Sequence, residues 1–116
     1  GVNRGVAVIR MPGDRRNEDI EAFGRLAAET FDELVIREGK TRGRRPGEVP
    51  ELLRAGALAG GLAPDNVSII LDERRAVTWA IERGGPGDLV VLMADEGRVS
   101  WLWEQVARGT GIDGAE

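Results

Sequence analysis

Four short apolar runs, each followed by a stretch with helical patterning, constrain the fold of this chain more than any other feature. The first run, Val6 to Ile9, is continuous, which is typical of a strand buried on both faces. Similar runs occur at residues 34–36, 67–71 and 89–93. Repeated strand-then-helix units connect through right-handed crossovers, so they predict a mainly parallel sheet with helices on both faces. We therefore predict an α/β domain with three αβα layers and a sheet of four or more strands.

The residues between these runs predict where the helices begin and end. Asn17 is placed to cap a first helix, because its side chain can accept hydrogen bonds from free backbone N–H groups. Pro50 suits the first turn of a second helix, where its missing N–H does no harm, and Gly60 with Gly61 ends that helix. Asp72 is placed to cap a third helix.

Small residues form a stripe along the second helix. Such a stripe allows close approach to a neighbouring element, and we predict that this element is the sheet. The stripe consists of Leu53, Gly56, Ala57 and Gly60.

At 116 residues the chain is long enough for one domain. We expect that domain to span residues 1–108, with a fourth helix at about 99–107 and a flexible tail at 109–116. Every apolar run is far shorter than the roughly 20 residues that span a bilayer, and residues 1–30 lack the pattern of a signal peptide. These features predict a soluble protein without membrane contact, and the absence of Cys favours a reducing cytoplasm.

Two residue types that carry much of protein chemistry are missing. The chain has no Cys and no His, so it lacks thiolate and imidazole ligands for zinc and the usual general base. We therefore predict no zinc site, and any chemistry would depend on carboxylate and guanidinium groups. We assign no catalytic residue and no metal ligand. The net charge of -4 argues against nucleic-acid binding, which needs a basic field. A homo-oligomer stays compatible with this composition.

Basic side chains gather in two loops that follow the first two predicted strands. Because the carboxyl ends of parallel strands lie at one edge of a sheet, we expect the two loops to lie together, where open α/β sheets bind ligands. Guanidinium groups on an otherwise acidic chain suit a small anion. The basic residues of the two loops are Arg15, Arg16, Arg37, Lys40, Arg42, Arg44 and Arg45.

Each basic loop has a structural interpretation beside the functional one. Asp14, Arg15 and Arg16 lie at a strand-to-helix turn, where free N–H groups and the helix dipole favour an anion. An Asp–Arg pair that only organises the turn is equally compatible with this position. In the second loop, residues 42–48 crowd guanidinium groups that repel one another unless an anion or a carboxylate lies between them. A solvated charge run is the alternative there.

Several blocks taken together resemble the C-terminal domain of Mur ligases, most closely that of cyanophycin synthetases. The resemblance covers about residues 5–107, and the blocks are specific in combination, although none would suffice alone. The blocks are Gly13 to Ile20, Phe31 to Glu38, Arg42 to Glu48, Leu71 to Glu73 with Ala76, and Pro86 to Val91.

The resemblance implies a Rossmann-like lid that closes over a central ATP-binding domain. Enzymes of this family join an amino acid to a peptide carboxylate through an acyl phosphate, and cyanophycin synthetases add arginine to an aspartate backbone. By resemblance, the residues that would face the nucleotide and its phosphates are Asp14, Arg15 and Arg16. Those that would lie near the incoming amino acid or the acidic peptide are Arg42, Arg44, Arg45 and Glu48. An Arg44→Ala change in the complete enzyme is then expected to lower ligation with little loss of fold stability.

The chain departs from the family pattern in what it lacks. The central domain, which would hold most of the ATP and Mg²⁺, is absent, and so are the strand and helix that usually precede the first strand. After the fourth strand, Asp95 to Arg98 replace the Gly-Lys-Gly-His of many Mur ligases. Asp95 and Glu96 could hold Mg²⁺, although a solvated loop is the more frequent outcome. We predict a lid domain that cannot turn over alone, with a non-enzymatic nucleotide- or anion-binding module as the alternative.

Overall fold

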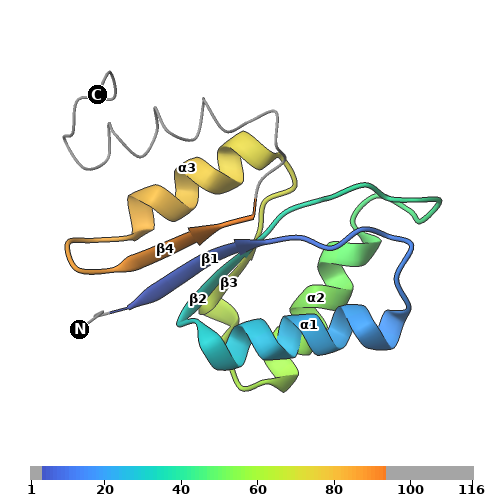
Figure 1. The fold of residues 1–116 in the computed structure, drawn as a ribbon, viewed down its shortest axis with the longest axis horizontal. Coiled ribbons are helices and arrows are strands. Elements are labelled where there is room, and N and C mark those ends of the chain that lie inside the picture. The colour runs from blue at the N-terminus through green and yellow to red at the C-terminus, as the bar shows by residue number, and fades with distance from the viewer. Residues whose placement is uncertain (1–3, 94–116) are drawn as a thin grey trace.

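The computed structural model describes residues 4–93, which form a four-stranded sheet and three α-helices (Figure 1). The strands are β1 (Gly5–Ile9), β2 (Glu33–Ile36), β3 (Val67–Ile69) and β4 (Leu89–Leu92). The helices are α1 (Asn17–Thr30), α2 (Glu48–Ala59) and α3 (Glu73–Arg83), with a short 3₁₀ helix, η1 (Pro64–Asn66), before β3. The helix predicted at 99–107, the tail at 109–116, and Asp95 with Glu96 lie outside the described residues.

All neighbouring strands are parallel, and their order is β3-β2-β1-β4. β1 lies between β2 and β4, with Val8 opposite Val35 on one side and Val6 opposite Val90 on the other. Residues Val6 to Ile9 are almost fully buried, as their continuous apolar run predicts. The predicted parallel α/β sheet is therefore confirmed.

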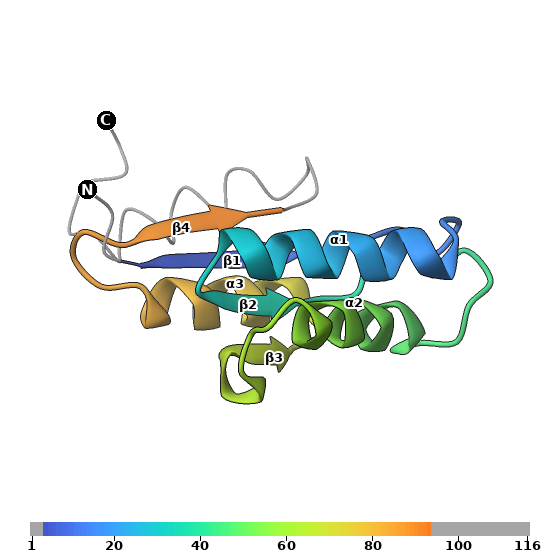
Figure 2. The ribbon, with the colours of Figure 1, turned by 90° about the horizontal axis from the view of Figure 1, so that it is seen from below.

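Helices cover both faces of this sheet (Figure 2). On one face, α1 and α2 pack their Ile20 and Leu53 side chains into a core with Ile9 and Leu34. On the other face, α3 packs against β1 and β2, and the residues of this second core are Val6, Val8, Val35, Ala76 and Ala80. The three predicted layers are thus present. No helix within residues 4–93 is long and apolar enough to cross a membrane.

α1 and α2 approach each other closely at two glycines. A Cβ atom on Gly56 would lie 2.0 Å from the Glu21 carbonyl oxygen of α1. A Cβ atom on Gly24 would lie 2.2 Å from the Leu53 carbonyl oxygen of α2. The prediction that the small-residue stripe faces the sheet is therefore wrong at Gly56. Both helices share one face of the sheet, so glycine serves their mutual contact, while Leu53 and Ala57 fill the core beneath.

Two predicted helix caps have different outcomes. Asp72 caps α3 as predicted, because its Oδ2 accepts a hydrogen bond from the Arg75 backbone N–H at 3.0 Å. Asn17 does not cap α1: Arg16 is the N-cap residue, and Asn17 is the first residue of the helix. The Asn17 Oδ1 atom instead accepts a hydrogen bond from Arg44 Nη1 at 2.7 Å. A guanidinium group from a distant loop has replaced the local backbone donor.

The direction of the chain across the sheet reverses at β1. The helices α1 and α2 carry the chain from β1 to β2 and β3, and α3 then returns it across the other face to β4. Open α/β sheets bind ligands outside the carboxyl ends of the strands at such a reversal. The two basic loops leave the sheet at this edge: the β1–α1 loop (residues 10–16) and the β2–α2 loop (residues 37–47).

Candidate anion-binding site

The β1–α1 and β2–α2 loops are in direct backbone contact. The Gly13 N–H donates a hydrogen bond to the Lys40 carbonyl oxygen at 2.8 Å. A Cβ atom on Gly13 would lie 1.9 Å from the Thr41 carbonyl oxygen, so this approach requires glycine. The prediction that the two basic loops lie together is confirmed.

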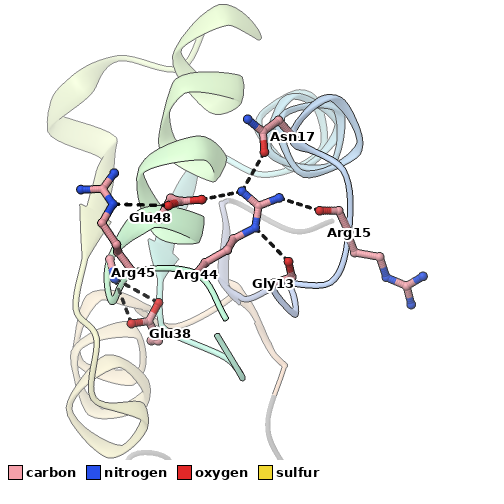
Figure 3. A network of polar contacts seen from close by, with 8 residues as sticks. Gly13, Arg15, Asn17, Glu38, Arg44, Arg45 and Glu48 are labelled. Carbon is pink, nitrogen blue, oxygen red and sulfur yellow. Dashed lines mark hydrogen bonds and ion pairs between the residues drawn. The ribbon is translucent and has the colours of Figure 1, made fainter. Parts of the chain in front are cut away.

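Arg44 fastens these loops together through its side chain (Figure 3). Its Nε donates to the Gly13 carbonyl oxygen at 2.8 Å, and its Nη2 donates to the Arg15 carbonyl oxygen at 2.7 Å. Its Nη1 donates to Asn17 Oδ1 at 2.7 Å and to Glu48 Oε2 at 2.6 Å. The Arg44 side chain is only 17% exposed. Its guanidinium group therefore binds other parts of the same chain.

Glu48 lies between two guanidinium groups (Figure 3). Its Oε2 is 2.6 Å from Arg44 Nη1, and its Oε1 is 3.5 Å from Arg45 Nε. The hydrogen bond from Arg44, assisted by both positive charges, holds the pKa of the Glu48 carboxyl below its ordinary value. The carboxylate thus relieves the repulsion between clustered arginines, which was one of the two solutions that the sequence left open.

Arg37 occupies the base of the β2–α2 loop and is only 2% exposed. Its Nη2 pairs with Glu73 Oε2 at 2.9 Å, and its Nε donates to the Met93 carbonyl oxygen at 3.1 Å. The next side chain, Glu38, accepts a hydrogen bond from the Gly47 N–H at 3.0 Å. The loop is therefore fixed at its base by Arg37 and near α2 by Glu38.

Besides Arg16, three arginines of the two loops are exposed. The side chains of Arg15 and Arg45 are 61% and 85% exposed, and Arg42 is also exposed. Arg42 has a φ of 51° and Gly43 a φ of 92°, so the outermost turn of the β2–α2 loop is left-handed. In Figure 3, the Arg15 and Arg45 side chains extend to opposite sides of Arg44. The guanidinium groups of Arg15 and Arg45 therefore do not converge on one point.

Acidic side chains accompany the β1–α1 loop as well. Asp14 Oδ1 lies 4.0 Å from Arg15 Nε, with both side chains largely exposed. Arg16 Nε lies 3.0 Å from Asp19 Oδ2 and 3.8 Å from Glu18 Oε2. The hydrogen bond from Arg16 lowers the pKa of the Asp19 carboxyl. Arg16 therefore stabilises the start of α1, and Arg15 is the cation of this loop that is held most loosely.

The two helix N-termini at this edge both lack a side-chain cap, and both have acidic side chains in the first turn. At α2, the carboxylates of Glu38 and Glu48 already lie beside the positive end of the helix. An open groove of about 520 Å³ beside it has residues 45–48, Glu51 and Leu52 as its lining. At α1, Glu18 and Asp19 occupy the first turn, and the N-cap residue Arg16 pairs with both carboxylates. The Arg15 side chain, one residue before Arg16, is the basic group there with the longest ion-pair distance.

The sequence patterns did not predict three residues of this arrangement as site residues. These residues are Gly13, Asn17 and Glu38. A glycine before Asp14 was the only available signal for the close contact at Gly13. Asn17 has the pattern of a helix cap, and nothing in sequence marks Glu38 as an acceptor for Gly47. Within residues 4–93, no group of three or more acidic side chains is arranged to hold a metal ion.

Comparison with curated proteins gives consistent relatives, although no family model matches the chain. Cyanophycin synthetase of Crocosphaera subtropica is 35% identical over 91 residues, and that of Nostoc sp. is 37% identical over 92 residues. Each match covers 78% of this chain and 10% of the relative. The chain therefore spans about a tenth of the length of these relatives.

Comparison with solved structures gives a Mur ligase. UDP-N-acetylmuramoyl-L-alanyl-D-glutamate--2,6-diaminopimelate ligase matches with a TM-score of 0.60 and 23% sequence identity. The match covers 78% of this chain and 18% of that ligase. The sequence relatives and this shared fold confirm the resemblance to the C-terminal domain of Mur ligases, including cyanophycin synthetases.

Proposed function

We propose that this chain, a homologue of one segment of cyanophycin synthetase with the fold of a Mur ligase domain, acts as the C-terminal lid of an ATP-dependent amide ligase. In this role it positions substrates but does not catalyse the reaction alone. The ligase would supply a central domain that holds most of the ATP and Mg²⁺. An acidic peptide and an amino acid would be the substrates, and the cytoplasm the compartment.

One observation carries this proposal: two loops at the reversal of the sheet are locked together, yet they present exposed arginines. Arg15 lies beside the start of α1, whose N-cap residue makes no side-chain cap, which favours nucleotide phosphates there. In the proposal, Asp14 and Arg16 frame that position. Arg42 and Arg45 face the acidic peptide or the amino acid, while Arg44 and Glu48 lie at the base of the same surface.

The physical contribution of these arginines depends on closure. An exposed guanidinium group gains little from an ion in water, because both remain hydrated. When a second domain covers the surface and excludes water, charge-assisted hydrogen bonds strengthen to about 1.5–3 kcal/mol each. A lid that closes over nucleotide and substrate would use exposed arginines in this way.

The test is ligation by the complete enzyme that carries this domain, with Arg15→Ala as the variant. Loss of one charge-assisted contact in the closed state should lower kcat/KM by about 10- to 100-fold. Arg25→Ala is the matched control, because Arg25 is 62% exposed on α1 and pairs only loosely with Glu29 at 3.8 Å. It should leave ligation unchanged. Equal kinetics for Arg15→Ala and Arg25→Ala would contradict the assignment of Arg15.

A non-enzymatic module that binds a nucleotide or another anion is the second candidate. The start of α1 and Arg15 belong to one chain, so such a site would need no partner domain. Calorimetric titration of the chain with ADP, ATP and short aspartate peptides separates the two functions. Tight binding of one nucleotide by the chain alone favours the module, and weak or absent binding favours the lid.

A further inference from the structure

We propose that Arg44 is a positioning residue that fixes the two basic loops relative to each other, and that it does not itself bind the ligand. This inference rests on the proposed anion-binding function of the exposed arginines. It also differs from the role that the family resemblance implies for Arg44, which is contact with the amino acid or the acidic peptide.

The first argument is the number of donors that Arg44 has available. A guanidinium group carries five N–H donors, and the hydrogen bonds to Gly13, Arg15, Asn17 and Glu48 account for four of them. All four distances lie between 2.6 and 2.8 Å, which is short for this type of bond. A ligand that accepted hydrogen bonds from these N–H groups would break the bonds that Arg44 donates to the other four residues.

The second argument is where these acceptors lie. The carbonyl oxygens of Gly13 and Arg15 belong to the β1–α1 loop, and Asn17 begins α1. Arg44 itself belongs to the β2–α2 loop, 31 residues from Gly13 along the chain. A planar guanidinium group spreads its donors over three nitrogen atoms and so reaches all three acceptors, whereas a lysine ammonium has its three donors on one nitrogen. The identity of Arg44 is therefore a matter of geometry as well as charge.

The third argument is the position of the exposed cations relative to Arg44. The Arg15 side chain extends from one side of the two loops that Arg44 links, and the Arg45 side chain extends from the other side (Figure 3). The Arg44 Nη2 atom holds the Arg15 carbonyl oxygen at 2.7 Å, so it fixes the backbone that carries the Arg15 side chain. Release of Arg44 would free that backbone while every exposed cation kept its charge.

The experiment combines amide hydrogen exchange with titration by inorganic triphosphate, on the full chain. The Gly13 N–H, which donates to Lys40, reports contact between the loops, and the Val8 N–H in β1 reports the sheet. Arg44→Lys keeps the positive charge but removes the planar guanidinium group that links the loops. Exchange of the Gly13 amide hydrogen should therefore accelerate at least about tenfold. Asn17→Ala removes one uncharged acceptor and should accelerate it less, whereas Arg45→Lys should leave it unchanged.

Triphosphate affinity distinguishes positioning from direct binding. Arg44→Lys should weaken binding by about two- to fivefold in the presence of Arg15, since one exposed ionic contact would be misplaced. In an Arg15→Ala background the same change should have almost no effect, because the contact that Arg44 positions is gone. A ligand role for Arg44 would instead give two losses that multiply.

Each result decides a separate question. Unchanged Gly13 exchange in both Arg44→Lys and Asn17→Ala would overturn the positioning role, and so would multiplicative losses of affinity. If the Val8 and Gly13 amides both exchange faster in Arg44→Lys, the substitution has also destabilised the sheet. Exchange of the Gly13 amide in the milder variant Asn17→Ala then tests the positioning role. Failure of the unaltered chain to bind triphosphate would contradict the anion site on the isolated chain, whereas Gly13 exchange would still test the link between the loops.

Discussion

Replacing Gly56 of α2 with Ala should destabilise the domain, although alanine is the better helix former. A methyl group at this position would lie 2.0 Å from the Glu21 carbonyl oxygen and 2.8 Å from its carbonyl carbon, both in the main chain of α1. Real Cβ contacts lie at 3.0 Å or more, so the two helices would have to separate by about 1 Å. Main-chain atoms within a helix cannot turn away as a flexible side chain can.

Two opposing terms give the expected size of this effect. Overpacking costs about 1–3 kcal/mol, and the upper end applies because the obstacle is backbone. The higher helix propensity of alanine offsets about 1 kcal/mol. The free energy of unfolding should therefore fall by about 2 kcal/mol, which lowers Tm by about 8 °C at about 4 °C per kcal/mol. Thermal unfolding of the full chain, followed by circular dichroism, measures this shift.

The neighbouring residue supplies the control. Ala55 is exposed on the same helix, so Ala55→Gly reports helix propensity alone and should cost about 1 kcal/mol. A Gly56→Ala protein that melts above the unaltered chain would refute the close contact of α1 and α2. Because these helices begin at the two basic loops, their separation should also draw Arg44 away from Asn17.

Two further predictions concern charged pairs. Glu73→Ala should lower the free energy of unfolding by about 3–5 kcal/mol in a denaturant titration, because it removes the carboxylate beside the buried Arg37 guanidinium. Glu82→Ala, an exposed change on the same helix, should stay within about 0.5 kcal/mol, and equal losses would refute the importance of the pair. The pKa of Glu48 is lower in the folded than in the unfolded state, so its stabilisation is present above the ordinary pKa of about 4.3 and is lost as the pH falls through the folded value. The unaltered chain should therefore be more stable than Glu48→Gln at pH 7, and the two melting temperatures should converge in acid; a constant difference would show that the charge of Glu48 is not responsible.

Much of the sheet could be predicted because local sequence determines it. A continuous apolar run such as Val6 to Ile9 is tolerated only where both faces are covered, and helical segments between such runs require parallel strands. Asp72 caps α3 through an N–H only three residues away, so local sequence was also sufficient there. The end of β3 was less predictable: the apolar run continues to Leu71, but strand pairing stops at Ile69.

Contacts between distant segments could not be predicted in the same way. Asn17 has all the local features of a helix cap, yet Arg44, 27 residues away, donates to its Oδ1 atom. The glycines of α1 and α2 present a similar problem, since a small-residue stripe reveals a close approach but not its partner. Gly56 meets α1 because both connections on that side of the sheet use the same face. Such partners depend on the complete topology.

The number of basic residues in the two loops also overstates how much positive charge is accessible to a ligand. Arg37 and Arg44 donate within the protein, and the exposed Arg16 pairs with Asp19, which leaves Arg15, Arg42 and Arg45 as the other exposed arginines of the two loops. Exposed guanidinium groups contribute only about 0–1 kcal/mol to an ion pair in water. The same groups contribute several times more where a partner surface lowers the effective dielectric constant. These arginines extend from loops that are fixed to each other, their guanidinium groups are exposed, and their ion pairs in water are weak. Such an arrangement is better suited to a lid that acts on closure than to a module that binds its ligand alone.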